Sequence, residues 1–147
     1  MKQNVLFLVH VENTFRKFFP DGMYVNRLIR ACQAKKYDKV FILVSNVNDY
    51  APIDELAEIT GRYQWIDWGW GYDPECFSHD PEELAWVIPA YGHEYTWVPN
   101  ELRDMADELK RSNVFVGGGY ESECLQDWLD CLDHFDIPFK KIHGYIY

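Results

Sequence analysis

An α/β fold built on a parallel sheet is predicted by three features of the 147-residue sequence. Short apolar runs alternate along the chain with segments of helical periodicity, which is typical of strands joined by crossover helices. The runs are almost continuously apolar, as expected for strands buried on both faces. No linker, repeat or low-complexity tract interrupts the alternation. We therefore expect one domain, residues 1–147, with three layers in which helices cover both faces of the sheet.

The amino-terminal half predicts the order strand, helix, strand, helix. Strands are expected at residues 5–11 and 40–44, where β-branched and aromatic residues dominate. A polar loop after the second strand leads into a short helix near residues 54–59. A helix is expected between the two strands, after a turn at residues 20–22. Its apolar residues have the i, i+3, i+4, i+7 spacing of an amphipathic helix: Val25, Leu28, Ile29 and Cys32.

The carboxyl-terminal half is less regular at its start. Residues 63–77 have no clear period, so a strand and a packed loop both remain open there. The aromatic residues of this segment are Trp65, Trp68, Trp70 and Tyr72. The remaining predicted elements are a helical turn at 80–83, a strand at 86–88, a helix capped by Asn100, a strand at 114–116, a helix that includes 125–132 and a closing strand near 141–147.

Charge and hydropathy exclude two classes of partner. The chain has 24 acidic and 14 basic side chains, so its field repels the phosphates of nucleic acid and of an anionic bilayer. No apolar run approaches the roughly 20 residues of a membrane helix, and no signal-peptide cleavage site follows the first apolar run. The four cysteines form neither a CxxC pair nor a zinc spacing, which predicts reduced thiols in the cytoplasm and no metal.

The fold class also predicts where a small-molecule ligand or substrate binds. In parallel sheets flanked by helices, ligands sit outside the carboxyl ends of the strands, where the strand order reverses. His10, Asp49 and the turn at residues 117–124 all fall at or just after the ends of predicted strands. Asp49 is either a pocket carboxylate or a turn residue, since aspartate is common in loops after strands.

Cys124 is the strongest candidate for a nucleophile. It follows a glycine-rich turn and falls in the first turn of a predicted helix, where backbone N–H groups and the helix dipole lower the pKa of a thiol. The same N–H groups, near Gly119 and Tyr120, could hold an oxyanion. The alternative is that Cys124 is a small buried residue at a helix start, and the neighbouring Glu121 and Glu123 oppose a thiolate.

Two motifs resemble one enzyme family. Leu8-Val9-His10-Val11-Glu12-Asn13-Thr14-Phe15, followed by Phe19-Pro20-Asp21-Gly22, resembles the opening of the isochorismatase-like cysteine hydrolases, which include nicotinamidases. Residues 116–125 are similar to the family's Gly-x-x-Thr-Asp-x-Cys-Val elbow, with Gly118 and Cys124 in register. The resemblance covers most of the chain. It implies a Rossmann-like, isochorismatase-like topology, shortened to about five strands, and hydrolysis of an amide or related C–N bond through an acyl-enzyme on Cys124.

The sequence departs from the family pattern at the catalytic positions. The family's base aspartate falls at His10, and its lysine falls near Tyr91, with His93 close by. Asn48-Asp49-Tyr50-Ala51-Pro52 is similar to the metal-binding Gln-Asp-Trp-His-Pro stretch of nicotinamidases. The histidine position is Ala51, however, so neither a metal nor another cofactor is expected.

Two interpretations of function remain open. In the first, His10 replaces the aspartate as general base for Cys124, giving a Cys-His hydrolase. In the second, the chemistry is lost and the fold serves as a small-molecule-binding or assembly module, with a pocket lined by Tyr91, Tyr120 and tryptophans; His10 is then structural. The tryptophans of residues 63–77 pack in the core by default, and the alternative is a subunit interface of a homo-oligomer.

Overall fold

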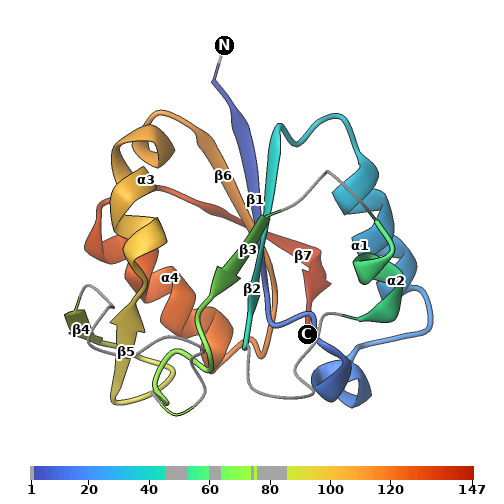
Figure 1. The fold of residues 1–147 in the computed structure, drawn as a ribbon, viewed down its shortest axis with the longest axis horizontal. Coiled ribbons are helices and arrows are strands. Elements are labelled where there is room, and N and C mark those ends of the chain that lie inside the picture. The colour runs from blue at the N-terminus through green and yellow to red at the C-terminus, as the bar shows by residue number, and fades with distance from the viewer. Residues whose placement is uncertain (1, 46–52, 60–63, 74, 76–85) are drawn as a thin grey trace.

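A five-stranded parallel sheet forms the centre of the molecule (Figure 1). The computed structural model describes residues 2–45, 53–59, 64–73, 75 and 86–147. The strand order is β3-β2-β1-β6-β7, and a separate antiparallel pair is formed by β4 and β5. The strands are β1 (Asn4–Val9), β2 (Lys39–Val44), β3 (Gln64–Asp67), β4 (Trp86–Pro89), β5 (Tyr95–Val98), β6 (Asn113–Gly118) and β7 (Lys140–Ile146).

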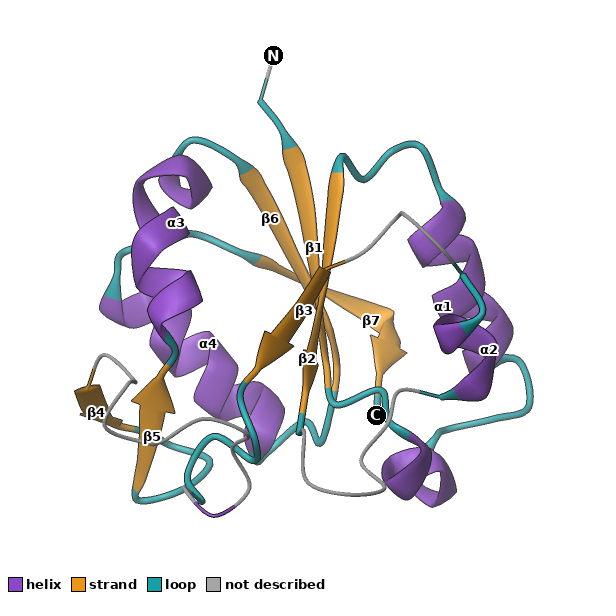
Figure 2. Ribbon diagram, viewed as in Figure 1, coloured by secondary structure: helices purple, strands orange, loops and turns teal. Residues whose placement is uncertain are grey.

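Helices cover both faces of the sheet, as the sequence predicts (Figure 2). The helices are α1 (Tyr24–Gln33), α2 (Asp54–Ala57), α3 (Asn100–Lys110) and α4 (Cys124–His134), with a 3-10 helix at Asn13–Phe18. On one face α3 and α4 pack against the sheet around the buried indoles of Trp68 and Trp128. On the other face α1 and α2 pack around Tyr24 and Leu28. The predicted α/β class and a sheet of five strands are confirmed.

The strand order reverses beside β1, the central strand. In β1, Val5 pairs with Lys39 of β2 and with Val114 of β6. The chain builds β1, β2 and β3 outward in one direction and then returns to place β6 on the other side of β1. Because all five strands are parallel, the ends of β1 and β6 lie at the same edge of the sheet. This is the place where the fold class predicts a ligand site.

Several element boundaries differ from the prediction. Strand β1 ends at Val9 rather than residue 11, because His10 has a left-handed φ of 50° that cannot continue a strand. Asn100 is the first residue of α3, and Pro99 takes the capping position with extended backbone. Residues 64–67 form β3 and the following described residues form a loop, so the aromatic segment contains both structures. The predicted turn at 80–83 lies outside the described residues.

The end of β6 packs backbone to backbone against β1. Gly118 has a φ of 92°, and a Cβ there would lie 2.1 Å from the carbonyl oxygen of Val9. Tyr147 covers the following turn: its N–H donates to the Gly118 carbonyl (3.0 Å), and its own carbonyl accepts the Glu121 N–H (2.8 Å). The turn between β6 and α4 therefore has a defined position relative to β1. In the part of the chain that the structure describes, no helix is long and apolar enough to span a membrane.

Candidate functional site

His10 stands at the carboxyl end of β1 in a conformation that its neighbours impose. Its N–H donates to the Leu43 carbonyl of β2 (3.0 Å), and its carbonyl accepts the Tyr147 hydroxyl (2.5 Å). A positive φ is uncommon for a side-chain-bearing residue and persists only where surrounding contacts hold it. These contacts turn the side chain of His10 into the protein, where it is 1% exposed.

The His10 imidazole forms a buried pair with Glu12. Nδ1 lies 2.7 Å from Oε1 of Glu12, and the Ser45 N–H donates to the same oxygen (3.0 Å). Burial raises the pKa of Glu12, and the hydrogen bond from His10 partly offsets that rise. A carboxylate only accepts hydrogen bonds, so a proton on Nδ1 faces Glu12. In the tautomer that carries only this proton, Nε2 is an acceptor. No described residue forms a hydrogen bond to Nε2.

Cys124 is the first residue of α4, as the sequence predicts. Two N–H groups of this turn, those of Glu123 and Leu125, donate to the Tyr120 carbonyl (3.0 and 3.1 Å). The Cys124 side chain is 9% exposed, and its thiol donates to the carbonyl oxygen of Trp70 (3.7 Å). The loop after β3 therefore covers the sulfur.

The expected lowering of the Cys124 pKa is wrong. Burial raises the pKa of this thiol, and the negative charges of Asp127, Glu123 and Glu12 raise it further. A helix N-terminus contributes only about half a positive charge, which desolvation and three carboxylates outweigh. Cys124 therefore rests as a neutral thiol. The contribution of Glu12 also shows that the ends of β1 and β6 place Glu12 within electrostatic reach of the sulfur.

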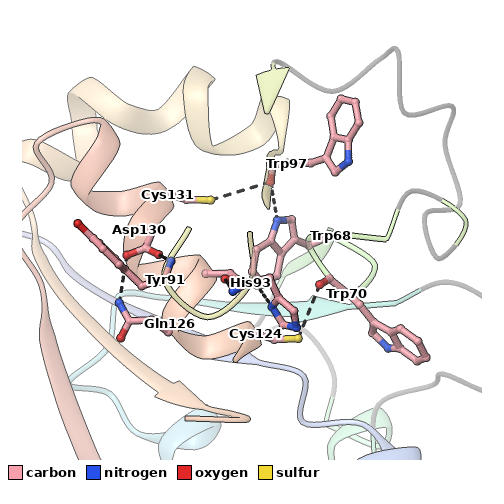
Figure 3. A network of polar contacts seen from close by, with 10 residues as sticks. Trp68, Trp70, Tyr91, His93, Trp97, Cys124, Gln126, Asp130 and Cys131 are labelled. Carbon is pink, nitrogen blue, oxygen red and sulfur yellow. Dashed lines mark hydrogen bonds and ion pairs between the residues drawn. The ribbon is translucent and has the colours of Figure 1, made fainter. Parts of the chain in front are cut away.

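A second histidine, His93, contacts the first turn of α4. His93 belongs to the turn between β4 and β5, and both its N–H (3.1 Å) and its Nδ1 (2.5 Å) are bonded to the carboxylate of Asp127. The Tyr91 N–H of the same turn donates to Asp130 (2.6 Å). Burial raises the pKa of Asp127, and the hydrogen bond from His93 partly offsets it. Two buried aspartates of α4 thus hold the turn that carries His93 (Figure 3).

The remaining predicted site residues are more dispersed. Tyr91 is 92% exposed and lines an open surface hollow with Asp130 and His134 rather than the space around Cys124. The Tyr120 ring is exposed and packs edge-on against Phe18. The Gly119 N–H donates to the Val9 carbonyl (2.9 Å), so it is engaged within the fold. Asp49 lies outside the described residues.

The aromatic segment contributes to the covering of the site. Trp68 is fully buried, donates from Nε1 to the Trp97 carbonyl (2.8 Å) and stacks on the His10 imidazole with ring centroids 5.7 Å apart. The default expectation of core packing is confirmed for Trp68. Trp65 is exposed. The segment after β3 therefore reaches both His10 and Cys124.

Two residues of the candidate site were missed by sequence reasoning, Glu12 and Asp127. Asp127 had a readable signal, because Cys124, Asp127, Trp128 and Cys131 follow the i, i+3, i+4, i+7 spacing of a buried helix face. An acidic residue on such a face needs a partner, and His93 supplies it. Glu12 had no comparable signal, since its burial depends on the turn that His10 makes after β1.

The fold and site together define an α/β protein with a buried cysteine and two histidine–carboxylate pairs, in segments near the carboxyl edge of a parallel sheet. Among the residues described, no group of three or more histidine, cysteine, aspartate or glutamate side chains is placed to hold a metal ion. Comparison of the chain with family models, with curated proteins and with solved structures gave no match.

Proposed function

We propose that the protein is a divergent isochorismatase-like hydrolase that cleaves an amide or related C–N bond through Cys124, with His10 as general base. One observation carries the proposal: the buried Nε2 of His10 has no hydrogen-bond partner among the described residues, while Nδ1 of the same ring is bonded to Glu12. This is how a basic nitrogen is prepared to accept a proton. The strand order supports the placement, because His10 and Cys124 follow the neighbouring strands β1 and β6.

The first half of the reaction moves two protons, one from Cys124 to His10 and one to the leaving nitrogen. Nε2 of His10 accepts the thiol proton of Cys124 as the sulfur attacks the substrate carbonyl carbon. Glu12 stabilises the imidazolium that forms, in the role of the third member of a triad. The C–N bond then breaks, the leaving nitrogen takes a proton from a second acid of the site, distinct from His10, and the acyl group remains on sulfur. A thiol with a raised pKa fits this order of events, because its proton moves during the attack and not before it.

The second half of the reaction regenerates the thiol. Water attacks the thioester carbonyl and gives one proton back to that second group, the carboxylic acid leaves, and the Cys124 sulfur takes back the proton from the His10 imidazolium. In the resting protein the Cys124 thiol donates its hydrogen bond to the Trp70 carbonyl. At the start of each turnover the thiol must donate to His10 Nε2 instead. The loop after β3 must therefore shift when substrate enters.

A second candidate function is a non-catalytic small-molecule-binding module on the same fold. The observation that favours it is the covering of Cys124, whose thiol is buried and already bonded to Trp70. In this case the His10–Glu12 pair is a structural contact that holds the end of β1.

Acylation by 4-nitrophenyl acetate separates the two candidates without knowledge of the substrate. We expect a burst of one 4-nitrophenolate per chain, an acetyl group on Cys124 by mass spectrometry, and no burst in Cys124→Ser. His10→Asn keeps a donor near Nδ1 for Glu12 but lacks Nε2, so acylation should slow by about 100-fold, the usual contribution of a general base. The buried Cys32 and Cys131 serve as internal controls.

The outcome that overturns the hydrolase is also defined. If the acetyl group is found on no cysteine of the native protein, or if His10→Asn is acylated as fast as the unmodified chain, His10 and Cys124 do not form a catalytic pair. The non-catalytic module is then the better conclusion.

A further inference from the structure

The His93–Asp127 pair has features that a purely structural contact does not need. Asp127 is fully buried, and both of its carboxylate oxygens are bonded to His93, one to the N–H and one to Nδ1. The imidazole itself is 20% exposed, and no described residue forms a hydrogen bond to its Nε2. A carboxylate at Nδ1 thus orients a ring whose other nitrogen is open to a ligand or to solvent.

The position of Asp127 on α4 brings its partner His93 close to the helix turn that contains Cys124. Asp127 lies one helical turn after Cys124, on the same helix face, and its charge raises the pKa of the thiol. His93 is bonded to that same carboxylate. In addition, the residue before His93 packs directly on the residue before Cys124: a Cβ on Gly92 would lie 2.4 Å from the Glu123 carbonyl oxygen.

The loop after β3 supplies an independent connection. The Trp70 carbonyl accepts a hydrogen bond from the Cys124 thiol. Two residues later, Tyr72 stacks on the His93 imidazole with ring centroids 3.7 Å apart. One short loop therefore contacts both groups. Figure 3 shows the His93 imidazole projecting from its turn toward the Cys124 end of α4.

The two histidines differ in their access to solvent. His10 is 1% exposed and His93 is 20% exposed. A buried base suits a proton that is passed to and from Cys124 within the protein. A partly exposed imidazole suits a proton that must reach a departing product or an incoming water molecule.

We propose that His93, oriented by Asp127, is the second catalytic residue of this site, the one that donates a proton to the leaving nitrogen. The proposal rests on the proposed hydrolase function. In acylation, the sulfur–carbon bond forms, the carbon–nitrogen bond breaks, and the Nε2 proton of the His93 imidazolium goes to the amine. In deacylation, neutral His93 takes a proton from the attacking water while the His10 imidazolium returns its proton to the sulfur. The sum is an amide and water giving an acid and an amine, with both histidines restored.

This assignment narrows the substrate class. A leaving group that needs protonation is a basic nitrogen, as in a primary amide that releases ammonia or a secondary amide that releases an amine. Activated acyl compounds that leave as stable anions would not need His93. The site is therefore built for unactivated amides.

Two esters with different leaving groups test the role of His93. The phenolate of 4-nitrophenyl acetate leaves without a proton, whereas the more basic phenolate of phenyl acetate is helped by one. His93→Asn keeps an N–H donor toward Asp127 and lacks Nε2. We expect this variant to be acylated by 4-nitrophenyl acetate within about twofold of the unmodified rate and by phenyl acetate about 100-fold more slowly, the usual size of general-acid catalysis.

Two further variants distinguish catalysis from support of the turn. Glu94→Ala changes the next, exposed residue of the same turn and should leave both acylation rates unchanged. Asp127→Asn should follow His93→Asn in its dependence on the leaving group, because it removes the charge that stabilises the imidazolium. Thermal unfolding of each variant establishes that the comparison is made on folded protein.

The failures of the two proposals are separable. If the unmodified chain is acylated at Cys124 and His93→Asn slows both esters equally, or neither, His93 is not the acid and only this inference is overturned. If neither ester acylates Cys124 in the unmodified chain, the hydrolase and the role of His93 fail together. If His93→Asn abolishes acylation by both esters while His10→Asn does not, the roles of the two histidines as assigned here are wrong.

Discussion

The imidazole of His10 and the carboxylate of Glu12 form a closed pair inside the protein, 2.7 Å apart and shielded from solvent. The pair sits on a backbone segment that leaves β1 through a left-handed residue. Neither group is stable there alone, because a buried carboxylate without a partner is costly and a buried imidazole without one loses its orientation.

Removing the imidazole should therefore destabilise the fold. His10→Ala leaves Glu12 without its side-chain partner, and we expect the free energy of unfolding to fall by about 3–5 kcal/mol, the range for breaking a buried pair. His10→Asn retains an N–H donor and a residue type that tolerates positive φ, so its loss should be clearly smaller. Urea denaturation at neutral pH measures both. Equal losses for the two variants would show that Glu12 does not depend on a donor at residue 10.

Two glycine substitutions test the close packing of the β4–β5 turn on α4. A Cβ on Gly92 would lie 2.4 Å from the Glu123 carbonyl oxygen and 2.8 Å from the Asp127 carboxylate. Gly92→Ala should therefore displace the turn and cost about 1–3 kcal/mol of unfolding free energy, as overpacking does. Gly22→Ala is the matched control, because nothing lies within 4 Å of a Cβ there. Chemical denaturation of both variants gives the comparison, and an unchanged Gly92→Ala would contradict the described contact.

The alkylation rate of Cys124 should depend on the exposed carboxylate of Glu123 and not on that of Glu121. Glu123 raises the pKa of the thiol, so Glu123→Gln should lower that pKa and increase the thiolate fraction at any given pH. We expect alkylation of Cys124 to become up to about fivefold faster, since one charge near 4 Å in water contributes about 1 kcal/mol. Glu121→Gln is the control, because Glu121 is no contributor to the pKa of this thiol and lies 4.0 Å from Lys141. A rate change that is the same in both variants would contradict the prediction.

The ion pair between Arg16 and Glu55 should make stability depend on pH in the acidic range. The two groups form two hydrogen bonds (2.9 and 2.5 Å), and Arg16 lowers the pKa of Glu55 from 4.5 to about 2. A carboxyl group whose folded pKa is depressed stabilises the fold above its unfolded pKa, and this contribution is lost as the pH falls toward the folded value. Because both side chains are partly exposed, the contribution is limited to about 1 kcal/mol.

The measurement compares Glu55→Gln with the unmodified chain at two pH values. At pH 7 the variant should be less stable by up to about 1 kcal/mol. Near pH 2 the difference should be small, because Glu55 is then about half protonated in the folded unmodified chain and almost fully protonated when unfolded. A difference that persists undiminished at pH 2 would mean that the glutamine disturbs packing and not charge.

The sheet and its helices were predictable because their signals are local. Residues 40–44 are apolar at every position, and the strand found there, β2, is buried along nearly its whole length. Cys124 was placed at a helix start by the glycines before it and the apolar stripe after it, and α4 begins at that residue. Such signals do not depend on which other segments are nearby.

The chemistry of the site was less predictable because it depends on contacts between distant segments. The pKa of Cys124 is set by burial under the Trp70 loop and by charges that include Glu12, more than a hundred residues earlier. His93 was noted from the sequence only for its closeness to Tyr91, and its pairing with Asp127 joins a hairpin turn to a helix. A one-dimensional pattern carries no information on that pairing.

The contact between Gly118 and Val9 has a consequence for how this site tolerates change. The two strand ends touch through main-chain atoms alone, with no room for a side chain between them. The distance between the two segments that carry His10 and Cys124 is therefore set by backbone contacts and does not depend on which side chains fill the interior. Interior side chains can be replaced by others of similar volume, and the surrounding loops can change in sequence. The ends of β1 and β6, which hold the imidazole and the sulfur, keep the same separation.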